Sequence, residues 1–478
     1  MIDLLLSVSF WVTAFLVVTW VAFSLLRLHI NSSVEKHRAQ LLQHLGPHAS
    51  RINKPVFLGF FHPYCNAGGG GERVLWTAIR DVQKEFPHVI CVVYTGDLDA
   101  TKQHIITKVK NSFNIEMDPD RLAFIYLHKR YLVEDTRYPR FTLVLQSLAS
   151  IILGYEAISQ LVPDIYFDTM GYAFTYPLVH YLCKTKIATY THYPTISSDM
   201  VNRVYERRAA HNNDARFASH PVWSLGKWVY YRLFARIYGF CGSFAQVVIV
   251  NSTWTKGHID QLWHTKSEIV YPPCDTERLN SLPLKGRQPI IVSVAQFRPE
   301  KDHALQLKSL AALFKKYPVW RTRGVELVLI GSCRNQGDQD RIDRLRQEAI
   351  DLGIQDVVRF EINASYDVLV STLGTAKIGI HTMWNEHFGI GVVEYMAAGL
   401  IPVAHNSGGP KLDIVTEYDG QPTGYLADSP DTFADCLNAA LETHDDAMAA
   451  NARASACDKF SEETFSSDLL CCLRPCLT

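Results

Sequence analysis

The sequence predicts an α/β protein with two domains, each a parallel sheet covered by helices, preceded by a transmembrane helix. Short strand-like apolar runs alternate with helical patterns over most of the chain, which is typical of parallel sheets. A proline-rich stretch at 271–286 reads as a linker between two such blocks. The 478 residues, 47% of them hydrophobic, suffice to bury two cores. We expect an anchor at 1–28, a first domain at 50–283 and a second domain at 284–465.

The overall charge and the cysteine pattern narrow the class of protein. The formal net charge is −1, so nothing in the overall balance indicates a nucleic-acid partner. The 11 cysteines are scattered, with no C-x-x-C pair and no metal-like Cys/His spacing. This pattern favours a reduced protein that faces the cytosol over a disulfide-stabilised secreted one.

The first apolar segment runs from Leu4 to Leu26 without a charged residue. A helix of this length crosses the roughly 30 Å hydrocarbon core of a bilayer. A cleaved signal peptide is the alternative, but no Lys or Arg precedes the run and no small-residue cleavage site follows it. Positive charges follow the run, beginning at Arg27, so we expect the body of the protein in the cytoplasm.

A glycine run follows the first predicted strand of the body. The strand covers Pro55 to Phe61, four consecutive glycines end at Gly71, and a helix is predicted from Val74 to about Lys84. Glycines between a strand and a helix let the backbone lie against a ligand. The pattern is neither of the common dinucleotide or P-loop motifs, and a loop without a ligand is the alternative.

The second domain contains the stretch around which the chain is organised. An apolar strand at 376–381 is followed by a loop with Gly389 and Gly391, and a helix then runs until Gly399. The first N–H groups of such a helix form an anion site suited to phosphate. Two carboxylates, Glu386 and Glu394, bracket this site, and carboxylates bind hydroxyl groups rather than phosphate. A ligand with both groups is a nucleotide sugar; for Glu394 alone, a first-turn acid favoured by the helix dipole is the alternative.

Further polar residues follow two other predicted strands. His192 comes at the end of a strand at 187–190, where ligands of open α/β sheets bind, although a buried structural histidine is the alternative. Arg298 and Lys301 follow the strand at 289–295, and two cations there can neutralise a diphosphate without a metal. A charged surface loop is the alternative for this pair.

No essential metal is expected. The run Asp97-Leu98-Asp99 imitates a D-x-D metal motif, but it follows an early strand without a carboxylate cluster around it in the sequence. We interpret it as a solvated turn.

Two segments stand apart from the predicted sheets. Residues 201–240 are basic and aromatic, which suits an anionic membrane surface or a lipid-linked pyrophosphate; an ordinary amphipathic helix is equally compatible. The tail at 468–476 contains three cysteines, and we expect the final helix to be shortened or altered there.

The chain after the anchor resembles the retaining glycosyltransferases of family 4, which have the GT-B fold: two Rossmann-like domains facing a cleft. The resemblance is carried by Glu386 and Glu394, separated by seven residues, together with the glycine loop. It implies that Glu386 contacts the donor sugar, Glu394 holds the ribose hydroxyls and His192 lies against the sugar. The remaining donor-diphosphate contacts implied by the resemblance come from Gly69, Gly70, Gly71, Arg298, Lys301 and the helix start at Phe388, Gly389 and Ile390.

Three runs, at 61–73, 191–197 and 295–301, are similar to one branch of this family. Its members add α-1,2-linked mannose from GDP-mannose to the dolichyl-diphosphate-linked Man3GlcNAc2 precursor of N-glycans on the cytosolic face of the endoplasmic reticulum. The resemblance therefore implies no cofactor beyond the donor GDP-mannose. Its expected partners are the dolichyl-diphosphate-linked oligosaccharide, the endoplasmic reticulum membrane and the other early mannosyltransferases of the pathway, with no nucleic acid. The alternatives are a catalytically silent scaffold that binds a nucleotide sugar or dolichol lipid, and a family 4 transferase with another lipid acceptor.

Overall fold

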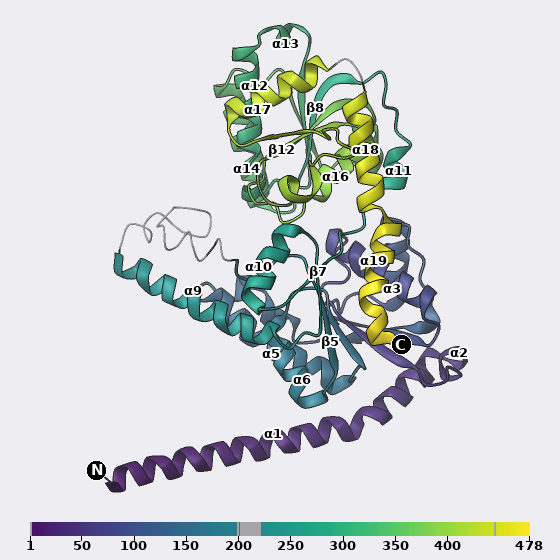
Figure 1. The fold of residues 1–478 in the computed structure, drawn as a ribbon, viewed down its shortest axis with the longest axis vertical. Helices are drawn as coiled ribbons and strands as arrows, with labels where there is room; N and C mark the ends of the chain where they lie inside the picture. The colour runs from purple at the N-terminus through teal and green to yellow at the C-terminus, as the bar shows by residue number, and fades with distance from the viewer. Residues whose placement is uncertain (1, 198–199, 201–220, 444–445) are drawn as a thin grey trace.

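Two parallel sheets, one after the other along the chain, form the body of the protein (Figure 1). The computed structural model describes residues 2–478 apart from 198–199, 201–220 and 444–445. The first sheet has the strand order β3-β2-β1-β4-β5-β6-β7 and the second the order β10-β9-β8-β11-β12-β13. Neighbouring strands pair in parallel in both sheets, as the alternation of strand and helix patterns predicts.

The strands lie close to where the apolar runs place them. Those of the first sheet are β1 (Val56–Phe61), β2 (Val89–Thr95), β3 (Leu122–Tyr126), β4 (Ile165–Asp168), β5 (Lys186–Thr191), β6 (Val247–Val250) and β7 (Glu268–Ile269). Those of the second are β8 (Gln288–Val294), β9 (Glu326–Gly331), β10 (Val358–Ile362), β11 (Ala376–His381), β12 (Ile401–His405) and β13 (Tyr425–Ala427). Buried apolar clusters lie on both faces of each sheet, which is why the strands read as continuous hydrophobic runs.

Helices cover both faces of each sheet. Those before the linker are α1 (Ile2–Leu45), α2 (Pro47–Ser50), α3 (Gly70–Glu85), α4 (Lys102–Phe113), α5 (Thr142–Gln160), α6 (Tyr176–Cys183), α9 (Pro221–Gly242) and α10 (Thr253–Trp263). Those that follow are α11 (Thr276–Asn280), α12 (His303–Lys316), α13 (Val319–Thr322), α14 (Gln336–Asp351), α15 (Tyr366–Thr375), α16 (Ile390–Ala398), α17 (Pro430–Glu442), α18 (Ala447–Phe460) and α19 (Glu462–Leu477).

Helix α1 is longer than the predicted anchor at 1–28. It continues as one helix to Leu45, and its second half lies against the first domain (Figure 1). Arg38 forms an ion pair with Asp164 at 2.9 Å, and the Asn31 side chain donates to the carbonyl of Leu182 at 3.1 Å. These contacts hold the second half of the helix against the first domain.

Helix α5 has a length and composition that by themselves would allow it to cross a membrane. Its buried side includes Leu153, Ala157 and Ile158, which belong to a core cluster of the first domain. Leu148 and Ile152 on its other side are exposed. The helix is therefore a core helix with an apolar outer face.

The expectation of a shortened or altered final helix is wrong. Helix α19 runs to Leu477 and crosses back from the second domain to pack against α3 (Figure 1). Its apolar face, from Phe465 through Leu469 and Leu473 to Leu477, is buried in a core cluster of the first domain. The four-residue spacing of these side chains puts them on one face of a helix, which forms in spite of Pro475 near its end.

Candidate active site

A cavity of about 270 Å³ lies between the two domains, where strands of both sheets end. His192 directly follows β5, Val294 ends β8 and His381 ends β11. The carboxyl ends of parallel strands are where ligands bind in open α/β sheets. Of the predicted site residues, those that line this cavity are Gly70, Gly71, His192, Lys301, Glu386, Phe388, Gly389 and Ile390.

The loop before α16 forms as the sequence predicts. Gly389 caps the helix at φ +115°, a backbone conformation that a residue with a side chain adopts only under strain. The N–H of Val392 bonds to the carbonyl of Gly389, so the amides of Ile390 and Gly391 precede the first hydrogen bond of the helix. The cavity therefore has an amide-lined wall at the positive end of α16.

Glu386 is held in this cavity by the side chains of Lys301 and His381. Lys301 Nζ lies 2.5 Å from Glu386 Oε2, and His381 Nε2 lies 3.2 Å from the same oxygen. Burial by itself would raise the pKa of Glu386, but the hydrogen bond from His381 and the charge of Lys301 hold it well below its usual value. Glu386 is therefore a fixed carboxylate at physiological pH.

His192 faces Glu386's loop from the first domain. Its Nε2 atom is buried and has no hydrogen-bond partner among the described residues, while the ring bonds to the backbone of Thr169. Burial lowers the pKa of His192 to about 4, so the ring is neutral. A Cβ atom on Gly71 would lie 3.6 Å from Nε2, which places this acceptor at the glycine loop. His192 can accept a hydrogen bond from a ligand hydroxyl.

The glycine run differs from prediction in one respect. Helix α3 begins at Gly70 rather than Val74, so Gly70 and Gly71 form its first turn. The Glu72 side chain accepts the Gly69 N–H, and this cap extends the helix back into the run. A Cβ on Gly70 would lie 2.7 Å from Ile390 Cδ1, so any other residue there would require the end of the Ile390 side chain to shift.

Two predicted phosphate-contacting residues lie outside the wall of this cavity. Gly69 caps α3 one residue before the glycines that line it. The Arg298 guanidinium lies 3.7 Å from Glu300 and is partly exposed, although its charge reaches Tyr193, which does line the cavity. Lys301, rather than Arg298, directly contacts the loop that carries Glu386.

The interpretation of Asp97-Leu98-Asp99 as a solvated turn is confirmed for Leu98 and Asp99, which are exposed in a turn, but is wrong for Asp97. Its carboxylate accepts the Asn66 N–H at 2.9 Å and pairs closely with Arg130. The Asp97 side chain is 13% exposed. It serves to fix the loop before the glycine run.

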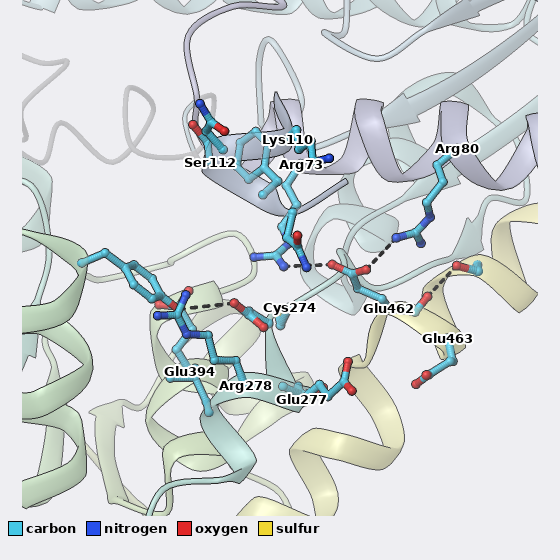
Figure 2. A pocket seen from close by; sticks show the side chains of 18 of the residues that line it. Arg73, Arg80, Lys110, Ser112, Cys274, Glu277, Arg278, Glu394, Glu462 and Glu463 are labelled. Atoms are coloured by element: carbon cyan, nitrogen blue, oxygen red, sulfur yellow. Dashed lines mark hydrogen bonds and ion pairs between the residues drawn. The ribbon is translucent and has the colours of Figure 1, made fainter. Parts of the chain in front are cut away.

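Glu394 lies in a second, larger cavity of about 1370 Å³ (Figure 2). The walls of this second cavity include Arg73 of α3, Arg278 of α11 and Glu462 of α19. Burial raises the pKa of Glu394 to about 7, and Asp275 acts in the same direction while Arg73 opposes it. The two cavities adjoin at α16, since Ile390 and Gly391 line the first and Glu394 the second.

Several residues of the site went unnoticed in the sequence. His62 Nδ1 lies 2.7 Å from Thr169 Oγ1, and its Nε2 lies 3.4 Å from Glu72, so a buried polar chain connects the glycine loop to the residue that holds His192. The one pattern that could have indicated them is Glu72 three residues after Gly69, which is typical of a capping box at a helix start. The other partners lie in distant segments, which one sequence cannot connect.

Contacts between the domains hold the loop that carries Glu386 and His387 in place. Ser252 Oγ, at the start of α10, donates to the carbonyl of His387 at 2.5 Å. Asp413 accepts hydrogen bonds from Thr253 and from the Tyr271 hydroxyl, which lies at 3.0 Å. The first domain is thus hydrogen-bonded directly to the loop that carries Glu386.

Two family models match the body of the chain. Residues 55–263 match "ALG11 mannosyltransferase N-terminus", and residues 275–456 match "Glycosyl transferases group 1". The chain is 48% identical over 430 residues to the GDP-Man:Man(3)GlcNAc(2)-PP-Dol alpha-1,2-mannosyltransferase of Mus musculus, covering 88% of this chain and 87% of that protein. It is 49% identical over 424 residues to the protein of the same name from Homo sapiens, covering 87% and 86%.

Solved structures share the architecture. The Anabaena protein HepE, crystallised with UDP and glucose, has a TM-score of 0.59 at 16% identity over 87% of this chain and 99% of its own. Sucrose-phosphate synthase from Thermosynechococcus elongatus has a TM-score of 0.61 at 16% identity over 88% of this chain and 98% of its own. At this identity the likeness shows the fold alone.

Two facing parallel-sheet domains, as in these solved structures, give the GT-B fold. The match of residues 275–456 to the group 1 glycosyl transferases gives the class, a glycosyltransferase. The identity over most of both chains settles the family. This chain belongs to the GDP-Man:Man(3)GlcNAc(2)-PP-Dol alpha-1,2-mannosyltransferases.

Proposed function

We propose that the chain transfers α-1,2-linked mannose from GDP-mannose to dolichyl-diphosphate-linked Man3GlcNAc2, with retention at the anomeric carbon. The names of its relatives give this donor and acceptor. The observation in the molecule that supports it best is the ionised, Lys301-paired Glu386 at the start of α16, facing His192 across the cleft. A helix start suits a diphosphate, and a fixed carboxylate opposite a neutral acceptor suits sugar hydroxyls.

The donor lies across both cavities in this proposal. The diphosphate binds the amides of Ile390 and Gly391, with Lys301 and Arg298 supplying positive charge and Gly70 and Gly71 closing over it. Gly69 sets the start of that glycine turn, and Phe388 and Gly389 shape the opposite loop. Glu394, further along α16 in the larger cavity, holds the ribose hydroxyls.

The transfer step follows from this placement. The bond from the anomeric carbon to the GDP phosphate oxygen breaks, and a bond to the acceptor hydroxyl oxygen forms on the same face of the sugar. The acceptor's proton passes to the departing phosphate oxygen, so no side chain needs to act as nucleophile or base. Charge stabilisation of the leaving diphosphate by Lys301, Arg298 and the helix start contributes most to the rate. Glu386 and His192 hold the mannose in the reactive orientation.

The reaction proceeds without an essential metal in this proposal, since Lys301 in the cavity and Arg298 outside its wall supply the positive charge that a divalent cation would otherwise bring to the diphosphate. We expect full activity after exhaustive treatment with a chelator. A loss of activity that Mg²⁺ or Mn²⁺ restores would contradict this part of the proposal.

The proposal places the protein in the endoplasmic reticulum membrane, with a single span at the start of α1 and the body in the cytosol. Support comes from the uncharged run Leu4–Leu26 within α1. Helix α9 and helix α5 also expose apolar side chains, among them Leu233, Phe240 and Leu148. Part of the basic and aromatic segment at 201–240 lies outside the described residues; α9 is the part that is described. Other early mannosyltransferases of the pathway are proposed as neighbours there.

Incubating the full-length protein in detergent with labelled GDP-mannose and the lipid-linked Man3GlcNAc2 acceptor tests the function. We expect lipid products with one and two added mannoses, both sensitive to an α-1,2-mannosidase. A protein that binds GDP-mannose and the lipid but transfers nothing would be a silent scaffold. Transfer to an inositol lipid, with none to the dolichol-linked acceptor, would show a family 4 transferase with another acceptor.

A further inference from the structure

The larger cavity extends beyond Glu394 into a group of residues that the proposed reaction does not use. They come from the linker, from α11 within it and from the start of α15, and they line the same cavity as Glu394. Figure 2 shows Arg278 and Glu394 on the same side of this pocket. The group consists of Asp275, Arg278 and Tyr366.

The three side chains are in contact with one another, with Arg278 over the Tyr366 ring and Asp275 at the ring's hydroxyl. The Arg278 guanidinium carbon lies 4.2 Å from the centre of the Tyr366 ring, and the Tyr366 hydroxyl donates to Asp275 Oδ2 at 3.3 Å. The Arg278 side chain is 55% exposed and Tyr366 is 43% exposed. Asp275 also carries acceptor capacity beyond this single hydrogen bond, since a carboxylate has about four lone-pair positions.

This group shares a cavity with Glu394, where the proposed function places the ribose of the donor. From Ile390 to Glu394 the helix rises by roughly 6 Å, so a diphosphate at the helix start puts the ribose at Glu394. The charge of Asp275 contributes to the raised pKa of Glu394, and both carboxylates contribute to the raised pKa of Tyr366, after burial. The three groups therefore lie within electrostatic range of one another, and a base attached to the ribose falls beside Tyr366 and Asp275.

The chemistry of this group fits guanine better than other bases. Guanine presents two adjacent donors, N1–H and the 2-amino group, which one carboxylate accepts together. Uracil presents a single donor between two acceptors, and adenine an acceptor at N1, so either would leave the Asp275 carboxylate facing an oxygen or nitrogen lone pair. Planar guanidinium and aromatic groups stack on bases of any kind, and a purine covers more of them than a pyrimidine.

We propose that Asp275 selects guanine by accepting its N1–H and 2-amino group, with the Arg278–Tyr366 stack as the surface on which the base lies. This inference rests on the proposed function, because it takes the donor's diphosphate to bind at α16. It adds the residues of the linker and α11 that determine which nucleotide sugar is used.

Titrations of the full-length protein with GDP, IDP, XDP and UDP test the proposal. IDP differs from GDP only by lacking the 2-amino group, and we expect it to bind roughly tenfold or more weakly. In Asp275→Asn the GDP-to-IDP ratio falls towards one and XDP binds more tightly than to the unchanged protein, because the amide donates to the 2-oxo group of xanthine. Asn is a good helix cap and is nearly isosteric with Asp, so the start of α11 is retained.

The control is Asp367→Asn, which removes another carboxylate of the same cavity, 4.0 Å from Arg278 and 94% exposed. It should keep the wild-type ratio. Equal binding of GDP and IDP to the unchanged protein, or an unchanged ratio in Asp275→Asn, would overturn the proposal. Loss of the ratio in Asp275→Asn, with no mannose transfer by the unchanged protein, would support base selection and refute the proposed reaction. Absence of any GDP binding would refute both.

Discussion

The two cavities that meet at α16 contain glutamates in opposite electrostatic states. Glu386, in the smaller cavity, is paired with Lys301 and His381, and its pKa is held well below its usual value. Glu394, eight residues later in the larger cavity, has its pKa raised to about 7 because burial outweighs the opposing charge of Arg73. The same residue type thus serves a preassembled charged site in one place and a site that becomes fully charged only near neutral pH in the other.

The cavities also differ in how they are built. The smaller one draws many of its residues from a single loop, 386–391, and is held by Ser252 and Asp413 of opposite domains. The larger one is assembled from helices of both domains, including α3, α4, α11, α15 and α19. We infer that chemistry takes place in the compact cavity and recognition of the nucleoside in the wide one. The predictions below test this division.

The largest effect is expected from Glu386→Ala. It removes the carboxylate that positions the sugar and leaves Lys301 without its partner, so kcat should fall on the order of 10³-fold. Steady-state transfer from GDP-mannose measures this, with circular dichroism to confirm the fold. Glu361→Ala removes a surface carboxylate that pairs with Arg359, and it should leave kcat unchanged. Full activity in Glu386→Ala would remove the smaller cavity from the chemistry.

Gly71→Ala should act on the donor rather than on folding. Its Cβ would lie 3.6 Å from His192 Nε2, which is an ordinary contact in the ligand-free protein, but it would occupy space that the donor needs. We expect kcat/KM for GDP-mannose to fall on the order of 10²-fold with the melting temperature nearly unchanged. Gly257→Ala, where an added Cβ meets nothing within 4 Å, is the matched control and should retain activity. Equal activity of the two variants would argue against the glycine loop as a donor contact.

Glu394→Gln should change the pH dependence of donor use. In the free enzyme Glu394 is protonated below pH 7 and becomes a carboxylate above it, so kcat/KM should rise through about pH 7 and then level off. The amide cannot titrate, and that rise should disappear while KM for GDP-mannose increases roughly tenfold. Steady-state kinetics from pH 5.5 to 9 measure the rise in kcat/KM and the KM for GDP-mannose on both sides of pH 7. A rise that persists in Glu394→Gln would assign the titration to another group.

Glu462→Gln should affect stability more than catalysis. Glu462 of α19 accepts hydrogen bonds from Arg73 at 2.8 Å and from Arg80 at 2.9 Å (Figure 2). These ion pairs join the last helix to α3. Because the side chain is 27% exposed, we expect a loss of roughly 1 kcal/mol in unfolding free energy. Urea unfolding checks this against Glu463→Gln, an exposed neighbour on the same helix. If the two variants unfold at the same urea concentration, the ion pairs do not contribute to docking α19.

Much of the fold could be predicted because its pattern is local. Buried parallel strands read as apolar runs, and β11 was predicted at its observed bounds. The donor loop could be predicted for the same reason, since Glu386, Gly389 and Glu394 lie within one strand–loop–helix unit. Gly389 has a positive φ, and a glycine at such a loop position predicts that conformation directly.

The rest depends on contacts between distant segments. His62, Glu72 and Thr169 form one buried chain although they come from separate strand ends and a helix, and Asp97 is paired because Arg130 lies across the sheet edge. The three cysteines of the tail do not indicate a regular helix, whereas the apolar spacing from Phe465 to Leu477 does, and it docks α19. One sequence shows the spacing within an element but not the partner on which an apolar face packs.

A structure of the full-length protein with GDP bound tests the central claim most directly. The account predicts that the diphosphate accepts hydrogen bonds from the amides of Ile390 and Gly391, that Lys301 contacts it, and that the ribose hydroxyls lie at Glu394. GDP bound away from the start of α16, or with its ribose in the smaller cavity, would contradict the account.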